Sequence, residues 1–233
     1  MKLIECVPNF SEGRRPEAVS AIRNAIAGIH GVTILDSSSD ESHNRSVITF
    51  VAPIENVVDA AFAGIREAVT QIDLRQHQGE HPRIGATDVV PFVPLEGATM
   101  EDCIALAKQL GERVGRELKI PVYLYERAAS RPTRVNLADV RRGQFEGLRD
   151  ELGTNPDRDP DFGPKAIHAS AGAVAIGARP FLVAYNVYLG PASTNLALAK
   201  AIAKSVRESS GGFQAVKGLG LDVDGQAQVS MNL

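Results

Sequence analysis

The chain has 233 residues, of which 44% are hydrophobic and 23% charged, and its formal net charge is −3. This length allows one large domain or two small ones, and the composition is that of a globular protein. An acidic balance without a Lys/Arg-rich block argues against nucleic acid as a partner, and no apolar run reaches the roughly 20 residues of a membrane span.

The first part of the chain alternates predicted strands and helices in the order β-α-β-β-α-β. Strands are expected at 2–7, 32–35, 46–51 and 87–93, helices at 16–31 and 53–69, and a polar loop at 36–44. Pro16 suits the first helical position, and the apolar residues of both helices recur at helical spacing. This order is the split βαβ arrangement of a ferredoxin-like unit.

The rest of the chain has a weaker pattern that ends in a second unit. We expect a helix at 99–117 with Thr99 as its N-cap, a strand at 121–125, a helix at 137–142, a linker at 155–160, a strand at 181–188, a helix from Ser193 to Gly211-Gly212, and a hairpin loop at 222–225. The predicted fold class is therefore α/β (α+β), with a first subdomain at 1–178 and a shorter, incomplete one at 179–233.

Cysteine usage bears on the compartment. Cys6 and Cys103 each lie in an apolar run, as expected of buried free thiols rather than a disulfide framework. The start of the chain lacks the long apolar segment of an export signal. We expect a cytoplasmic protein whose partners are small molecules or a second copy of itself.

The densest polar cluster is the segment 77–85, which reads HQGEHPRIG. Its two histidines, His77 and His81, match the H-x-x-E-H pattern of some zinc peptidases, which needs a helix to turn both rings toward one metal. Gly79 and Pro82 oppose a helix. We therefore predict a loop and no metal site.

A solvated loop is the simplest interpretation of such a cluster, but a functional loop is favoured here. Two glycines and a proline shape the backbone around a histidine, a glutamate and an arginine. The unperturbed pKa of histidine, about 6.5, suits His81 to general base catalysis. The neighbouring Arg83 is suited to binding a carboxylate through two hydrogen bonds.

Two further polar segments follow predicted strands, at 7–14 and 36–45. The second contains His43, Asn44 and Arg45. For these segments the alternatives are a turn or solvated loop and a part of the site. The sequence leaves open whether they lie at the same end of the sheet or at opposite ends.

These residues carry a resemblance. The segments 5–13 (ECVPNFSEG), 44–45 (NR), 79–85 (GEHPRIG), 121–125 (PVYLY) and 161–172 (DFGPKAIHASAG) closely resemble the formiminotransferase domain family, in order and at similar spacing. The resemblance implies a glutamate formimidoyltransferase of histidine degradation and one-carbon metabolism. It also implies tetrahydrofolate as the one-carbon acceptor, two subdomains with facing sheets and outer helices, and a homodimer.

The resemblance also implies site residues. The histidine of the Gly-Glu-His-Pro-Arg motif is the catalytic base in this family, which corresponds to His81. The stretch expected to line the folate site is Gly163, Pro164, Lys165, Ala166, Ile167, His168, Ala169, Ser170, Ala171 and Gly172. From their chemistry we add Arg45 and Arg83 as carboxylate clamps, and Asn9, Asn44 and Glu80 as further substrate or folate contacts.

The chain also departs from the family pattern, because relatives continue beyond the segment that resembles 228–233. We expect either a truncated product or a short form whose second sheet is completed by another chain. Two other functions stay open: a folate one-carbon transferase that uses a formyl donor, and a non-catalytic folate-binding protein.

Overall fold

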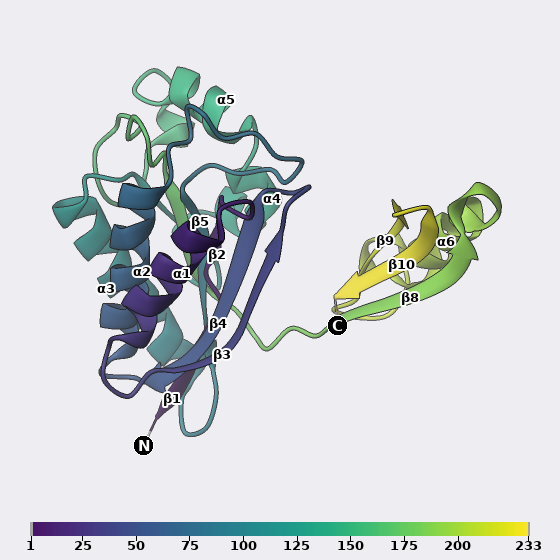
Figure 1. Ribbon diagram of the computed structural model, residues 1–233, viewed down its shortest axis with the longest axis horizontal. Helices are drawn as coiled ribbons and strands as arrows, with labels where there is room; N and C mark the ends of the chain where they lie inside the picture. The colour runs from purple at the N-terminus through teal and green to yellow at the C-terminus, as the bar shows by residue number, and fades with distance from the viewer. Residues whose placement is uncertain (1, 233) are drawn as a thin grey trace. The chain divides into compact units, whose positions relative to one another are not determined.

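The computed structural model of the protein describes residues 2–232. It has two compact units, one ending at Pro180 and one beginning at Phe181 (Figure 1). Each unit has its own sheet with helices packed on it, so the predicted α+β class is confirmed.

The first unit is built on a seven-stranded mixed sheet. Its strands are β1 (Leu3–Cys6), β2 (Asn9–Phe10), β3 (Thr33–Asp40), β4 (Arg45–Pro53), β5 (Thr87–Pro94), β6 (Val122–Glu126) and β7 (Val174–Ala178). β1 and β2 together lie between β4 and β5, and β3 pairs with β4, which is the strand order of a ferredoxin-like unit. β7 and β6 extend the sheet beyond β5 as parallel strands.

Three long helices cover one face of this sheet (Figure 1). They are α1 (Pro16–Ala27), α2 (Val57–Gln71) and α3 (Met100–Glu117). Pro16 begins α1, as predicted. The Thr99 side chain accepts a hydrogen bond from the Asp102 N–H, and Asp102 accepts from the Thr99 N–H, which completes a capping box.

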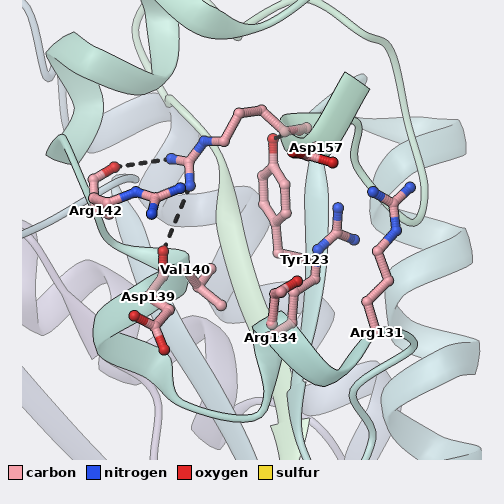
Figure 2. Close-up of a pocket in the computed structure, with 9 residues that line it drawn as sticks. Tyr123, Arg131, Arg134, Asp139, Val140, Arg142 and Asp157 are labelled. Carbon is pink, nitrogen blue, oxygen red and sulfur yellow. Dashed lines mark hydrogen bonds between the residues drawn. The ribbon is translucent and has the colours of Figure 1, made fainter. Parts of the chain in front are cut away.

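The other face of the sheet is covered beside β5, β6 and β7 by α4 (Leu137–Val140) and α5 (Gln144–Glu151). Short 3-10 turns at Pro132–Arg134 and Pro156–Arg158 flank these helices. A hollow of about 430 Å³ opens here, lined by four arginines, two aspartates and Tyr123 (Figure 2). Arg134 pairs with Asp161 and Arg158 with Glu151, so these two buried arginines hold the surrounding loops together.

The polar segment 36–44 differs from its prediction as a loop. β3 continues through it to Asp40 and pairs with β4 as far as Arg45, after a bulge between Ile34 and Asp36. The segment has no apolar alternation because β3 is an edge strand with exposed side chains. The strand at 36–40 therefore could not be predicted from its own residues, because it forms by pairing with β4.

Other boundaries also differ from prediction. α2 begins at Val57 because Pro53 still belongs to β4. A short strand that was not predicted, β2, follows the first predicted strand directly after Pro8, which has no N–H to donate. The helix α5 and the strand β7 were not predicted. β7 is buried on both faces, so it shows no alternation of polar and apolar residues.

The second unit consists of β8 (Ala184–Pro191), α6 (Ala192–Val206), β9 (Lys217–Val223) and β10 (Gln226–Asn232), with a 3-10 turn at Glu208–Ser210. The sheet order β8-β10-β9 repeats the order β1-β4-β3 of the first unit. The predicted cap at Ser193 is wrong, because α6 begins one residue earlier. Its first N–H, from Ala192, donates to the Gly225 carbonyl instead.

Among the described residues, no helix is both long enough and apolar enough to cross a membrane.

Candidate active site

The polar segments around residues 9–14, 40–45 and 77–83 meet at one end of the first sheet. Gly79 is essential to this contact, since a Cβ there would lie 2.3 Å from the His43 carbonyl oxygen. A Cβ on Gly13 would lie 2.3 Å from the Asp40 carbonyl oxygen. The structure therefore places at the same end the loops whose relative position the sequence left open.

Asn44 joins these loops. Its side-chain oxygen accepts a hydrogen bond of 2.9 Å from the Gly13 N–H, and its amide nitrogen donates one of 2.9 Å to the Gln78 carbonyl. The residue adopts a left-handed conformation with φ of 47°, which asparagine tolerates better than most residues. Asn44 is buried and acts as a brace between backbones rather than as a free group.

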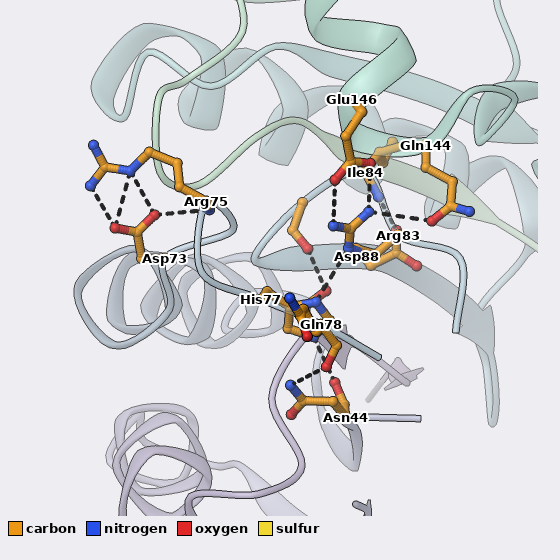
Figure 3. Close-up of polar contacts among 12 residues, drawn as sticks. Asn44, Asp73, Arg75, His77, Gln78, Arg83, Ile84, Asp88, Gln144 and Glu146 are labelled. Atoms are coloured by element: carbon orange, nitrogen blue, oxygen red, sulfur yellow. Dashed lines mark hydrogen bonds and ion pairs between the residues drawn. The ribbon is translucent and has the colours of Figure 1, made fainter. Parts of the chain in front are cut away.

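His77 continues the brace toward α5 (Figure 3). Its Nδ1 accepts from the Arg83 Nε–H at 3.2 Å, and its Nε2 lies 3.0 Å from the Asn44 carbonyl oxygen. Because Arg83 can only donate and a carbonyl can only accept, these partners require the neutral ring with its proton on Nε2. Burial is the main cause that lowers the pKa of His77, which favours the same neutral form.

Arg83 is held by an internal carboxylate. Its two terminal nitrogens donate to the two oxygens of Glu146 at 2.8 and 2.7 Å, and the arginine is buried (Figure 3). The edge of the guanidinium that would bind a substrate carboxylate is thus occupied by α5. In this structure Arg83 positions the loop.

Arg45 has a different environment. Its Nε donates to the Asn9 side-chain oxygen at 2.9 Å, and its Nη2 also hydrogen-bonds that oxygen. Asn9 is fixed in turn, because its amide nitrogen donates to the Val7 carbonyl. Among residues 2–232, Arg45 therefore has a neutral amide as its partner and forms no ion pair.

His81 lies half-buried beside these groups. Its ring centroid is 6.5 Å from that of His43 in an edge-on arrangement, and His43 pairs with Asp40. Burial, together with the positive charges of Arg45 and Arg141, lowers the pKa of His81 to about 3. The free ring is therefore neutral at physiological pH and has a lone pair available to accept a proton.

Arg141 enters the site from the end of α4. Its Nη2 hydrogen-bonds the buried carboxylate of Asp88, whose other oxygen accepts from the Ile84 N–H at 2.9 Å. The Nε of Arg141 is buried without a hydrogen-bond partner. Burial raises the pKa of Asp88, although Arg141 opposes this effect.

The stretch 163–172 is only partly beside this cluster. Its last residues pair with the His81 loop: Gly85 and Gly172 form a bridge, and the Ala86 N–H donates to the Ala171 carbonyl. Its first residues lie next to β6, where the Val122 N–H donates to the Phe162 carbonyl, and Lys165 pairs with Asp159. Glu80 is exposed, with its N–H donating to the Ser42 carbonyl.

The sequence analysis missed Arg141, Asp88 and Glu146. Asp88 carried a usable signal, since it is a charged residue within the apolar strand 87–93 and must therefore have a partner. Arg141 and Glu146 lie in the Arg-rich segment with weak periodicity, where only tertiary packing decides which side chains reach the site. Across the described residues, no group of three or more histidine, cysteine or acidic side chains is arranged to hold a metal.

The first unit is a ferredoxin-like sheet with a cluster of histidines and arginines at one end. Comparison with known proteins identifies the family to which this unit belongs. Residues 3–179 match the family model described as "Formiminotransferase domain, N-terminal subdomain". The chain belongs to this family, as its motifs predicted.

Named relatives match over the whole chain. It is 52% identical to "Glutamate formimidoyltransferase" of Thermoplasma acidophilum and 47% identical to the protein of that name from Streptococcus pyogenes serotype M1; each match covers all of this chain and 77% of the relative. It is also 43% identical to the rat (Rattus norvegicus) "Formimidoyltransferase-cyclodeaminase", of which it covers 44%.

Proposed function

We propose that this chain is a glutamate formimidoyltransferase, which moves the formimidoyl group of N-formimidoyl-L-glutamate to tetrahydrofolate. The main support is the similarity to two proteins of that name over the full length of the chain. The site supports it too, because His81 lies near two guanidinium groups, which suit the carboxylates of an anionic amino-acid donor.

His81 is proposed as the general base. Tetrahydrofolate supplies the nitrogen that attacks the amidine carbon of the donor. His81 accepts the proton released by that nitrogen and returns it to the glutamate nitrogen as the carbon–nitrogen bond to glutamate breaks. Asn9 and Asn44 hold the backbone and Arg45 around His81, so that both substrates are positioned before the proton moves.

The stretch 163–172 is proposed to contact the folate. Its residues 170–172 run beside the segment 84–86, which directly follows the His81 loop. The proposal includes two small-molecule substrates and a homodimer, which the family resemblance implies, and the cytoplasm, which the two free buried thiols favour.

The decisive experiment mixes the chain with N-formimidoylglutamate and tetrahydrofolate and follows both the folate product and free glutamate. Equal amounts of product and glutamate are expected. A protein that binds folate but releases no glutamate would instead be a non-catalytic folate-binding protein. Faster transfer from N-formylglutamate would identify the formyl-donor alternative.

A further inference from the structure

Arg45 forms no ion pair among the described residues, and Arg141 pairs with a carboxylate through a single terminal nitrogen. Arg83, by comparison, has both terminal nitrogens bound to Glu146. Arg45 uses two of its nitrogens on one neutral oxygen, that of Asn9. Among the described residues, its third nitrogen, Nη1, forms no hydrogen bond, so a half-buried positive charge keeps a free donor edge.

Strand register brings the two arginines to one level of the sheet. Asn9 on β2 lies opposite Val47 of β4 and Val89 of β5. Arg45 is the first residue of β4, and Asp88, the partner of Arg141, is the second residue of β5. Both arginines therefore reach the end of the sheet where Asn9 lies, from opposite sides of β2.

Asp88 accepts a hydrogen bond from only one of the three guanidinium nitrogens of Arg141. One terminal nitrogen of the guanidinium bonds the carboxylate, while the buried Nε has no hydrogen-bond partner. Asp88 is itself fixed by the Ile84 N–H. A buried guanidinium nitrogen without an acceptor is costly, and a ligand that supplied the missing acceptor would remove this cost.

We propose that Arg45 and Arg141 together bind a carboxylate group of a substrate next to His81, with Asp88 as the residue that positions Arg141. This inference rests on the proposed function and replaces Arg83 by Arg141 in carboxylate binding. A carboxylate fits because the planar donor edge of a guanidinium matches its two oxygens. Two substrates offer this group: the glutamate part of the donor, and the glutamate tail of the folate.

Carboxylate binding here also affects the base. Arg45 and Arg141 both act to lower the pKa of His81 in the free protein. A bound anion offsets their charge, so the affinity of His81 for a proton rises when the substrate is in place. The base then becomes stronger in the substrate complex than in the free enzyme.

The test compares Arg141→Lys and Arg45→Gln with wild type. Loss of a charge-assisted hydrogen-bond pair is expected to raise the KM of the substrate concerned about 10- to 100-fold, with a smaller change in kcat. A rise for N-formimidoylglutamate assigns the donor. A rise for tetrahydrofolate that disappears with a pterin acceptor lacking the glutamate tail assigns the folate.

Arg142→Gln is the matched control, because Arg142 is the next arginine along the chain and is exposed. If Arg141→Lys fails to fold, Arg45→Gln still tests the proposal, because removing the Arg45 guanidinium leaves no buried carboxylate without its partner. Calorimetric titration with glutarate, a plain dicarboxylate, gives a second readout that needs no turnover.

Weaker glutarate binding in both site variants, with the control unchanged, supports the site even if wild type transfers no formimidoyl group; in that case only the proposed function fails. Folded site variants with unchanged KM values and unchanged glutarate affinity overturn the inference. An equal loss in Arg142→Gln also overturns it, because that would show a general effect of charge.

Discussion

At the scale of single residues, His81 is set apart by its surroundings. The unperturbed pKa of a histidine already suits acid–base chemistry, but burial and two arginines lower that of His81 to about 3. Its neighbour His77 is locked by two partners and has no free lone pair. The two histidines of one motif thus have different tasks, one proposed to be chemical and the other structural.

Replacing His81 by alanine is expected to lower kcat by about 10²–10⁴-fold, because it removes the group that moves the proton. Folate affinity should change little, which equilibrium binding measures. His77→Ala serves as the comparison. Equal losses in both variants that zinc restores would point to the metal site rejected above.

The pKa of His81 gives a second prediction, which histidine NMR can check. In the free protein, His81 should stay neutral down to a much lower pH than an unperturbed histidine. Arg45→Gln removes a nearby positive charge and should raise the pKa of His81, whereas Arg142→Gln should not. A wild-type His81 that titrates at about 6.5 would contradict this account.

The lowered pKa of His81 also makes the free energy of unfolding depend on pH. Between about 6.5, the unfolded value, and about 3, the unfolded chain binds the proton of His81 while the folded chain does not. The free energy of unfolding therefore falls as the pH falls through this window and is not reduced above it. Chemical unfolding at a series of pH values measures the slope, which His81→Gln should make shallower.

At the scale of elements, the site depends on loops held together by hydrogen bonds between strands and α5. The chain of contacts runs from Glu146 through Arg83 and His77 to Asn44, which is followed directly by Arg45. Each link joins a different segment of the chain. The orientation of Arg45 is therefore set partly by a helix about a hundred residues later in the sequence.

His77 gives a matched pair of substitutions for this network. In His77→Gln the amide oxygen can accept from Arg83 and the amide nitrogen can donate to the Asn44 carbonyl, so stability and kcat should stay close to wild type. His77→Ala leaves both groups unpaired and should cost about 1–3 kcal/mol of unfolding free energy. Urea denaturation measures this, with His30→Gln as an exposed control. Equal stability of the two His77 variants would show that the network contributes nothing.

At the scale of the whole molecule, the two units differ in how well they cover their apolar residues. Of the eleven exposed large apolar side chains among the described residues, nine belong to the second unit, for example Tyr188, Phe213 and Leu219. β8 and β9 form the edges of its sheet. Exposed apolar groups beside unpaired strand edges favour association.

We therefore predict that the chain is not a monomer, and that the segment after residue 179 contributes to its assembly. Light scattering on the full chain and on a chain ending at Arg179 should show a larger assembly for the full chain. A monomeric full chain whose strand β10 is well protected in hydrogen exchange would show that the second unit is stable by itself.

The sequence by itself determined the ferredoxin-like order of the first unit, the three long helices and the loop around His81. Apolar periodicity, Pro16 and the Thr99 cap are local signals, and they act through short-range sterics and hydrogen bonds. The Gly-Glu-His-Pro-Arg motif was readable because glycine and proline exclude a helix there. The family followed from the same motifs and was confirmed by comparison.

Only the tertiary structure decided which polar residues meet. Pairing between β3 and β4 turned an apparent loop into strand, and parallel pairing created β7 from a run without alternation. Glu146 of α5 occupies the donor edge of Arg83, and the buried carboxylate of Asp88 holds Arg141. The pairing of β7 with β5 and both arginine contacts join residues more than fifty positions apart in the chain, and local sequence holds no information about such contacts.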